Sequence, residues 1–567
     1  MILTIMGKTM KKLTKIILPL LYLGQTSIVN AEIKLDESTK NIIKGIIDPT
    51  PNIFGSKFWD LDSAGTPSNT ENFQYFGTAV SSGDYNNDGY EDLAVGIPGY
   101  DFFTLNNTGT VLILYGTANG LSGVNSQFLF QTFVTSPPNV ENDNGVEAND
   151  FFGTTLASGD FNCDGFVDLA VGTPDEDVTL VGDGGVSRDN VGAVNIFYGS
   201  ASGFADNGQG STFLLQGTGT NFFSNMVSDG DKWGFSMAVG NFNYDSNNGN
   251  QCMDLAISAP YEDFGNNNSI VDGGQVDVLF GSASGIDGSD RETISQNSAG
   301  VADSTESNDL FGYSLAAGNL GKTVVGIDLA VGVPGEKVNN LTDAGIVQVF
   351  YSDGENGFMT SVDDQIWSQD SSGVAGLSEA GDKFGSAVVI ANFDGAAYAD
   401  LAISATEEDL NSQGITNAGA VNVLYSTVNG LTSAGNQLFY QLNAGLQGDP
   451  QNQDRFGETL TAGDLNYDGV ADLVVGVPSE AVSSGAFHVI YGVSNSGLTT
   501  QNDDYFENSN GGDQLSISMA IGDFGNGPEL ATGMPAYNSA DNNIDSGAVQ
   551  VFEFINPDVI FKDDFEN

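Results

Sequence analysis

The sequence predicts an all-β protein in which seven similar units close into one ring, a seven-bladed β-propeller. Three observations predict this fold. One sequence block occurs seven times, every copy reads as short strands, and a spare strand precedes the first copy while none follows the last. Repeats of this kind are typical of stacked architectures in which a single unit cannot bury its own apolar surface.

The repeated block begins in most copies with an aromatic residue followed by glycine. Its clearest form, FGTAVSSGDYNNDGYEDLAVGIP, starts at Phe76, and further copies start at Phe152, Trp233, Phe311, Phe384, Phe456 and, more weakly, Leu515. The first six starts are 72 to 81 residues apart, and the last follows after 59. A glycine and an alternating apolar run, such as GAVNIFYG, follow each block. The 567 residues therefore indicate one repeat domain rather than several unrelated domains.

Each unit contains three apolar runs bounded by Gly, Pro, Asn or Asp, and a fourth run precedes the block, which predicts four strands. The run FWDLDSAG at Phe58 has the form of IWSQDSSG at Ile366 but stands before the first block. A ring has no unpaired edge if this strand, near 58–61, completes the seventh blade. We therefore predict a propeller over residues 55–554; an open array or two sandwiches are the alternatives.

The composition excludes several classes of function. The chain carries 74 Asp and Glu against 16 Lys and Arg, for a formal charge of −58. Binding to nucleic acid or to an anionic membrane surface requires basic residues that are scarce here. A hydrophobic content of 40% and 36 Phe exclude a disordered acidic polymer. With one His, a catalytic mechanism that needs a histidine base would depend on that residue alone.

The N-terminal segment has the pattern of a secretory signal peptide. Four Lys precede the apolar run 16–24, and small or aliphatic residues at 29–31 suit cleavage after Ala31. We expect residues 1–31 to be removed, 32–54 to form a leader segment and 555–567 a tail that alternates Phe with acids. No later run is long enough to span a bilayer. The predicted location is secreted or at the cell surface, with a mature charge of −62 because four Lys are lost.

Three blocks contain an acidic loop between the first two predicted strands. Side-chain oxygens stand at loop positions 1, 3 and 5, glycine at 6, a backbone carbonyl at 7 and Asp at 9. Ca²⁺ prefers six to eight hard oxygen ligands, and glycine permits the tight turn. A plain hairpin turn is the alternative for one loop, but three identical spacings predict Ca²⁺ sites. The ligands are Asp84, Asn86, Asp88, Tyr90 and Asp92; Asp160, Asn162, Asp164, Phe166 and Asp168; and Asp464, Asn466, Asp468, Val470 and Asp472.

The remaining loops depart from this pattern. A fourth Ca²⁺ site is predicted in the third block, although an insertion delays its last ligand. In the fifth block Ala396 replaces the position-5 ligand, and the loops after Asn319 and Asp523 have lost most ligands and read as turns. The fourth site would consist of Asn241, Asn243, Asp245 and Asp254; the fifth block retains Asn392, Asp394 and Asp400.

The two cysteines, Cys163 and Cys252, fall in neighbouring loops of the second and third blocks. In an exported protein an even number of cysteines favours a disulfide. Two buried free thiols are the alternative, because the bond requires Cα atoms closer than about 7 Å.

The pattern FG…GD.N.DG..DLAVG.P…GAV.V.YG resembles the FG-GAP repeat of the integrin α-chain N-terminal propeller, over about 500 residues and all seven copies. The resemblance implies Ca²⁺ in hairpin loops on one face and a ligand on the opposite face. Acidic loops at 136–151, 175–190 and 261–272 correspond to that ligand face. Integrin α-chains carry further domains and a membrane helix, and FG-GAP propellers also occur beside catalytic domains, as in a phospholipase D specific for lipid-anchored proteins; neither addition is recognised here.

The preferred function is a secreted, Ca²⁺-binding module that recognises an extracellular protein or glycan, as in cell adhesion. We expect a monomer without enzyme activity, in which His488 is an ordinary strand residue. A hydrolase or lyase acting on polysaccharide through paired carboxylates is one alternative. A structural component of a surface layer or matrix, with the tail from Asn556 as a sorting signal, is another.

Overall fold

The computed structural model describes most of the chain after residue 52. The chain divides into two compact units, and all described residues belong to the second, residues 51–567. The predicted signal peptide, the leader up to residue 52 and the tail 555–567 lie outside the described residues, as do several loop segments. The described residues are 53–63, 66, 71–131, 146–180, 186–204, 211–216, 227–247, 249–265, 269–322, 326–352, 364–443, 445–508, 511–525, 527–539 and 543–554.

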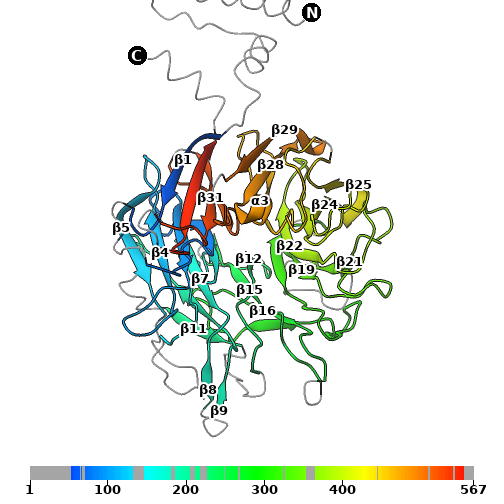
Figure 1. Cartoon of the computed structure of the whole chain (residues 1–567). Helices are drawn as coiled ribbons and strands as arrows, with labels where there is room; N and C mark the ends of the chain where they lie inside the picture. The colour runs from blue at the N-terminus through cyan, green and yellow to red at the C-terminus, as the bar shows by residue number, and fades with distance from the viewer. Residues whose placement is uncertain are drawn as a thin grey trace, which may run out of the picture. The chain divides into compact units, whose positions relative to one another are not determined.

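Seven antiparallel sheets of four strands form the blades, which confirms the predicted propeller (Figure 1). Blade 1 consists of β2 (Val80–Gly83), β3 (Asp92–Ile97), β4 (Thr110–Tyr115) and β5 (Ser122–Leu129). Blade 2 consists of β6 (Thr155–Gly159), β7 (Asp168–Thr173), β10 (Ala193–Phe197) and β11 (Thr212–Leu215). Blade 3 consists of β12 (Met237–Gly240), β15 (Asp254–Ala259), β16 (Gln275–Leu279) and β17 (Arg291–Ile294).

The remaining blades repeat this order. Blade 4 consists of β18 (Ser314–Gly318), β19 (Asp328–Val333), β20 (Ile346–Phe350) and β21 (Gln365–Trp367). Blade 5 consists of β22 (Phe384–Ala391), β23 (Asp400–Ala405), β24 (Ala420–Thr427) and β25 (Gly430–Phe439). Blade 6 consists of β26 (Thr459–Gly463), β27 (Asp472–Val477), β28 (Ala486–Val493) and β29 (Gly497–Glu507). Blade 7 consists of β30 (Met519–Asp523), β31 (Pro528–Met534), β32 (Ala548–Phe554) and β1 (Ile53–Trp59).

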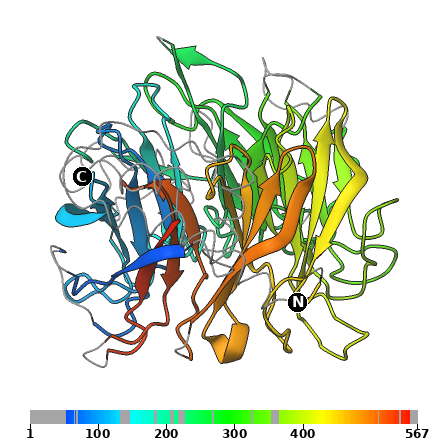
Figure 2. The ribbon, with the colours of Figure 1, turned by 90° about the horizontal axis from the view of Figure 1, so that it is seen from above.

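The N-terminal strand closes the ring, as the sequence predicts. β1 pairs antiparallel with β32, with Phe58 opposite Gln550, and the two strands lie side by side in Figures 1 and 2. The strand covers Ile53–Trp59 rather than the predicted 58–61. It ends at Trp59 because Asp60 begins a turn, in which the Asp60 backbone N–H donates to Ser63 Oγ at 2.9 Å. The strand that closes the ring therefore begins with Ile53 and Phe54, which fall in the predicted leader segment.

Every blade is joined to the preceding one at the start of its repeated block. The backbone N–H of the first residue of the block, aromatic in six copies and Leu515 in the seventh, donates to the carbonyl just before the third strand of that neighbour. Gly109 lies directly against Phe152 in one such contact, where a Cβ atom would come within 2.2 Å of a carbonyl oxygen. The seven bonds run from Phe76, Phe152, Trp233, Phe311, Phe384, Phe456 and Leu515 to Ser546, Thr108, Val191, Gly273, Ala344, Ala418 and Ser484, in that order.

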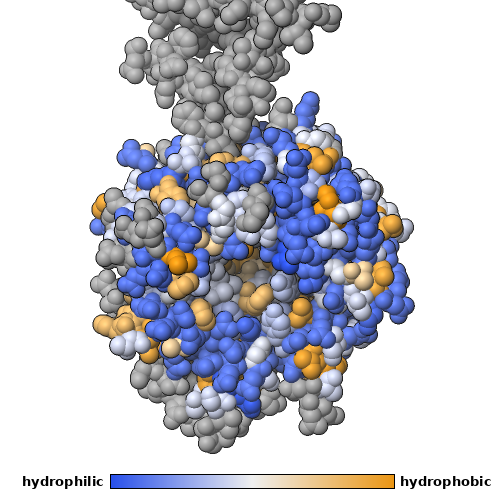
Figure 3. Space-filling view, in the orientation of Figure 1, coloured by the Kyte–Doolittle hydropathy of each residue, from blue (hydrophilic) through white to orange (hydrophobic). Residues whose placement is uncertain are grey.

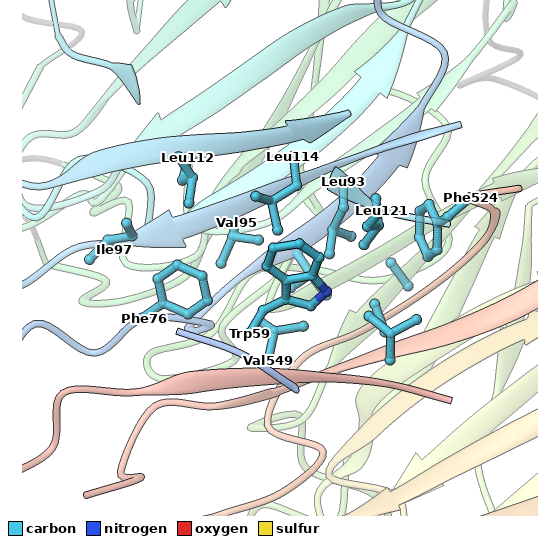
Figure 4. Close-up of a cluster of buried hydrophobic side chains, with 14 of the residues drawn as sticks. Trp59, Phe76, Leu93, Val95, Ile97, Leu112, Leu114, Leu121, Phe524 and Val549 are labelled. Carbon is cyan, nitrogen blue, oxygen red and sulfur yellow. The ribbon is translucent and has the colours of Figure 1, made fainter. Parts of the chain in front are cut away.

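The apolar core lies between adjacent blades rather than inside one sheet. Figure 4 shows the cluster at the closing point, where Trp59 of β1 packs with side chains of blades 1 and 7, among them Phe76, Val95, Phe524 and Val549. The second strands of blades 1 to 6 are buried along their whole length, as in Asp92–Ile97 and Asp472–Val477. Burial of both sheet faces explains why these strands read as continuous apolar runs.

Two small hairpins and one helical turn extend from the blades. The loop between β7 and β10 contains β8 (Val178–Leu180) and β9 (Val186–Arg188). The insertion in the third block forms β13 (Ser246–Asn247) and β14 (Asn250–Gln251). The turn α3 (Glu480–Ser483) follows β27. Within the described part of the chain, no helix has the length and apolar character needed to cross a membrane.

Candidate calcium loops and the opposite rim

The predicted Ca²⁺ loops connect the first and second strands of the blades. Because the strands are antiparallel, the connections between strands 1 and 2 all emerge on one rim of the ring, which we call the hairpin rim. The connections between strands 2 and 3, and those from one blade to the next, emerge on the other, which we call the opposite rim. The sequence-predicted ligands therefore share one rim.

In blade 1 the loop is organised around its own side-chain oxygens. The Asp88 N–H donates to Asp84 Oδ1 at 3.0 Å and to Asn86 Oδ1 at 2.9 Å. The Gly89 N–H donates to Asp84 Oδ2 at 2.9 Å, and Tyr90 N–H donates to Asp88 Oδ1 at 3.0 Å. These bonds draw the side chains at positions 1, 3 and 5 toward the same turn. Gly89 has a φ of 93°, which glycine adopts without strain.

Blades 2 and 6 repeat the arrangement. Asp164 N–H donates to Asp160 Oδ1 and Asn162 Oδ1, both at 3.0 Å. Asp468 N–H likewise donates to Asp464 Oδ1 at 3.0 Å and Asn466 Oδ1 at 2.9 Å. The N–H groups of Gly165 and Gly469 close the turns on the position-1 carboxylates, and those of Phe166 and Val470 donate to the position-5 carboxylates.

The Asp at position 9 begins the second strand and lies beneath each loop. Asp92 is fully buried, and it accepts the N–H of Tyr85 at 3.0 Å and that of Gly116 at 2.9 Å. Burial, together with the neighbouring loop carboxylates, raises the pKa of Asp92 to about 7. The same causes raise the pKa of Asp168 to about 8 and that of Asp472 to about 7. A divalent cation beside these carboxylates would offset the cost of burying their charge.

The loop of blade 3 forms the same turn despite its insertion. Asp245 N–H donates to Asn241 Oδ1 at 3.0 Å and to Asn243 Oδ1 at 3.1 Å. The additional residues form the β13–β14 hairpin, after which Asp254 accepts the Phe242 N–H at 2.7 Å. Oδ1 of Asp245 is buried and accepts no hydrogen bond. An orphaned carboxylate oxygen at position 5 fits a cation ligand.

Among the residues that the structure describes, the loops of blades 4, 5 and 7 do not show the complete arrangement. In blade 5, Asn392 Nδ2 donates to the Ala396 carbonyl at 2.7 Å, as Asn241 does to the Asp245 carbonyl in blade 3, but Ala396 offers no side-chain oxygen at position 5. In blade 7, Asp523 Oδ1 accepts the N–H groups of Gly525 and Gly527, both at 3.0 Å. In blade 4, burial raises the pKa of Asp328, the Asp that begins the second strand, to about 7, and the nearby Lys322 lowers this pKa in part.

The hairpin loops also contact one another between blades. Glu91 N–H donates to the Asp523 carbonyl at 2.8 Å, and Met253 N–H donates to the Asp160 carbonyl at 2.9 Å. Cys163 and Cys252 form a disulfide with Cα atoms 4.7 Å apart, which decides the question that the sequence left open. A cation in one loop would therefore order a contact between two blades.

The predicted ligand-binding loops are only partly described. Most of 136–151 lies outside the described residues, whereas 175–190 carries the β8–β9 hairpin and 261–272 is closed by a bridge between Phe264 and Ile270. The face seen in Figure 3 is largely hydrophilic, with apolar residues in small separate groups. His488 lies in β28 and is fully buried, consistent with a strand residue.

A second recurring feature, which was not predicted from the sequence, lies on the opposite rim. In five blades a Gln of the preceding blade donates Nε2 to a Glu that follows the second strand, and an Asp precedes the block by two residues. In blade 5, Gln369 donates to Glu408 Oε2 at 2.6 Å, with Asp382 beside them. Alignment of the repeats would have revealed these positions. The groups are Gln131, Glu176 and Asp150; Gln216, Glu262 and Asp231; Gln296, Glu336 and Asp309; Gln369, Glu408 and Asp382; and Gln441, Glu480 and Asp454.

Comparison with known proteins agrees with this architecture. The FG-GAP repeat model matches residues 76–114, 152–194 and 456–490, which are the three blades with complete acidic loops. The chain carries FG-GAP repeats. Integrin alpha-3 of Mus musculus is 37% identical over 103 residues, 18% of this chain and 8% of the integrin. Integrin alpha-PS3 of Drosophila melanogaster is 35% identical over 126 residues, 22% and 10% of the two chains.

The chain is also similar to phosphatidylinositol-glycan-specific phospholipase D of Bos taurus. The two are 29% identical over 245 residues, which cover 43% of this chain and 25% of the phospholipase. The FG-GAP chain thus spans a quarter or less of the lengths of these curated relatives.

Proposed function

We propose that the chain is an extracellular, Ca²⁺-binding FG-GAP propeller that recognises a protein or glycan, as in cell adhesion, through its opposite rim. The observation that carries the calcium part is the convergence of side-chain oxygens in the loops of blades 1, 2 and 6. Each loop offers three side chains and a buried Asp, and the carbonyl at position 7 is the further predicted ligand. Bound Ca²⁺ would neutralise these acids and stiffen the contacts between neighbouring blades.

The calcium part is tested by counting bound ions. We expect equilibrium dialysis of the exported chain against Ca²⁺ to give at least three ions per chain, and a fourth if the loop of blade 3 binds. The triple variant D88A/D164A/D468A should lose three of them. An unchanged count in a folded triple variant would contradict the assignment.

The recognition part is supported by the separation of the two rims. Apart from the β13–β14 insertion of blade 3, the connections between the first and second strands on the hairpin rim are short, whereas the opposite rim carries longer connections such as the β8–β9 hairpin. Long surface loops on a rigid scaffold are common binding elements.

The recognition part is tested with glycan arrays and with extracellular protein panels, probed with and without Ca²⁺. A specific ligand whose binding is reduced by shortening the β8–β9 hairpin would support the proposal. Depolymerisation of a polysaccharide by the purified chain would instead establish an enzyme.

A further inference from the structure

The opposite rim carries tyrosine in blades 7 and 1 where the other blades carry glutamate. Tyr537 and Tyr100 stand three residues after the end of the second strand, which is the position of the Glu in blades 2 to 6. The two blades are neighbours, because β4 and β5 lie beside β1 and β31 at the closing point of the ring (Figure 1). This part of the rim therefore differs in chemistry from the rest.

Five aromatic rings are in contact on this side of blade 1. Tyr100 packs against Phe128 and Phe130, with ring centroids 5.7 and 6.0 Å apart. The Phe102 ring lies 5.1 Å from that of Phe130 and 4.6 Å from that of Phe103. Phe103 is 91% exposed, and the other four side chains are partly exposed. The cluster thus leads from the end of β5 to a ring that stands in solvent.

Two further exposed apolar side chains extend this cluster toward blade 7. Phe73 and Ile544 are joined by a backbone hydrogen bond of 2.8 Å, and both side chains are about half exposed. Gly99, directly before Tyr100, donates its N–H to the Gln74 carbonyl at 3.1 Å and so holds the two segments together. Contiguous apolar surface of this kind marks interaction sites. We call it the aromatic surface; it comprises Phe73, Tyr100, Phe102, Phe103, Phe130 and Ile544.

The backbone at Phe103 is unusual for an aromatic residue. Phe102 and Leu105 exchange two backbone hydrogen bonds, of 3.0 and 3.1 Å, across a two-residue turn in which Phe103 has a φ of 55°. Blade 4 forms the same turn with Asn339 at this position, at a φ of 53°. Asparagine tolerates this conformation, whereas a bulky side chain is strained in it. Folding of the turn does not require phenylalanine, so the exposed ring points to binding.

The segments that carry the aromatic surface lack basic residues. Neither 60–131 nor 511–554 contains a Lys or Arg. Lys57 of β1 donates its Nζ to the Leu121 carbonyl, at the start of β5 and therefore at the other end of that strand from Phe130. A ligand with carboxylate or sulfate groups would meet no cation from these segments in a strongly acidic protein. The ligand that fits is therefore uncharged or basic.

The polar groups beside the turn are carboxylate and amide groups. Asp101 Oδ1 accepts the Asn107 N–H at 2.8 Å, and Asn107 Nδ2 donates to Asn149 Oδ1 at 3.0 Å. Asn106, next to them, is exposed. An amide can both donate to and accept from a hydroxyl group, and a carboxylate accepts from one. Aromatic rings beside these groups suit a ligand that has an apolar face and many hydroxyl groups.

We propose that the aromatic surface binds an uncharged glycan. The C–H groups on one face of a sugar ring carry partial positive charge, which complements the negative face of an aromatic ring such as that of Phe103. The sugar hydroxyls would bond to the amides and to Asp101. This inference rests on the proposed recognition function of the opposite rim, and it narrows that function to one ligand class at blades 7 and 1.

The test is affinity electrophoresis of the full chain in native gels that contain neutral glucan, mannan, galactan or xylan. Alginate and polygalacturonate are the acidic comparisons. We expect retardation by at least one neutral polysaccharide and by neither acidic one. F103N, which gives blade 1 the turn residue of blade 4, should weaken this binding roughly tenfold, as for an aromatic hot spot. The control L377A removes another exposed apolar side chain of the same rim and should leave binding unchanged.

Failure of this inference is distinguishable from failure of the proposed function. Absence of retardation by every neutral polysaccharide, or retardation that F103N leaves intact, would overturn the aromatic surface as a glycan site. Binding that is instead reduced by shortening the β8–β9 hairpin would keep recognition on the opposite rim. A protein ligand that is lost in F103N would overturn the glycan class. The proposed function itself fails if neither a glycan nor a protein binds this rim.

Discussion

The hairpin loops of blades 1 and 4 both end at a buried Asp that begins the second strand, but the charged residues around this Asp differ. Asp92 and Asp328 are both fully buried, and each accepts two backbone N–H groups, one from its own loop and one from just after its third strand. Around Asp92 lie the acids Asp84 and Asp88, whereas Lys322 lies near Asp328. The buried carboxylate therefore has acidic neighbours in the loop of blade 1 and a basic neighbour in the loop of blade 4.

In both loops the Asp that begins the second strand accepts two backbone N–H groups, which is a structural role distinct from the predicted metal binding. It joins the hairpin loop to the end of the third strand in six blades, through Asp92, Asp168, Asp254, Asp328, Asp400 and Asp472. Metal binding would then be an addition in those blades that also supply acids at positions 1, 3 and 5. The following predictions test this division, in order of decreasing effect.

The largest effect is expected from removing position-5 acids. Each occupied site stabilises the folded state by about 2.7 kcal/mol at a Ca²⁺ concentration 100 times its Kd, so the D88A/D164A/D468A variant should lose about three times this amount. Thermal unfolding with Ca²⁺ and with EDTA measures the difference. The control D523A alters a loop without the ligand set, and its Ca²⁺-dependent stabilisation should equal that of the wild type. Equal losses of Ca²⁺-dependent stabilisation in D523A and in D88A/D164A/D468A would refute the distinction between loops.

The next effect concerns the disulfide, which ties the loop of blade 2 to the insertion of blade 3. Replacing both cysteines by serine should lower the free energy of unfolding by about 2–4 kcal/mol. It should also weaken Ca²⁺ binding to this loop, because Cys163 lies between its ligands Asn162 and Asp164. Denaturant unfolding and calcium titration measure the two effects. Unchanged values for the C163S/C252S variant would show that the hydrogen bonds between the loops suffice.

Asparagine substitutions of the Asp that begins the second strand separate its hydrogen bonds to the backbone from its predicted role as a metal ligand. In EDTA, D168N and D328N should each cost about 1–3 kcal/mol, because the amide nitrogen cannot accept a backbone N–H. Adding Ca²⁺ should stabilise D328N as much as the wild type but stabilise D168N less. Chemical denaturation in both buffers makes the comparison. If D328N also loses Ca²⁺-dependent stability, the fourth loop is a metal site and the contrast between blades fails.

The smallest effect is the part of the pH dependence that the opposite rim adds to that of the buried hairpin-rim aspartates. Burial raises the pKa of Glu408 and Glu480 to about 7, so the folded protein binds protons more tightly than the unfolded chain. Their contribution to stability is complete below pH ~4.5 and is lost as the pH rises through 7. In EDTA the melting temperature should fall between pH 5 and 8. E408Q should flatten this slope slightly, whereas E71Q, at an exposed position, should leave it unchanged.

The repeats made the architecture predictable. Seven copies, four runs per unit and the early strand at Phe58 together imply a closed ring, and the structure has that topology. The bounds of β1 were less predictable, because its upstream residues Ile53–Lys57 continue the pairing without a strongly alternating pattern. The β13–β14 hairpin was likewise read only as an insertion, since two-residue strands have no periodicity to detect.

The site was predictable where the chemistry is local in sequence. The acids of blade 1 lie within nine residues, so their spacing indicates the loop directly. The group of Gln296, Glu336 and Asp309 on the opposite rim joins two separate connections, and its amide comes from the preceding blade. Pairings between blades depend on the packing of the ring, which no single segment specifies. For the same reason the sequence alone did not decide whether Cys163 and Cys252 form a disulfide, and the distance between their Cα atoms did.

The pairing of β1 with β32 has a consequence for how the molecule acquires its fold. Ser56 and Gln550, which are hydrogen-bonded across this pair, are 494 residues apart. The first strand is made long before its partner, and closing so long a loop is slow because entropy must be lost before the contact forms. Until then β32 presents an unpaired edge, which is a surface prone to aggregation. Deleting residues 53–59 should therefore leave six blades nearly intact and yield a chain that associates through the open seventh.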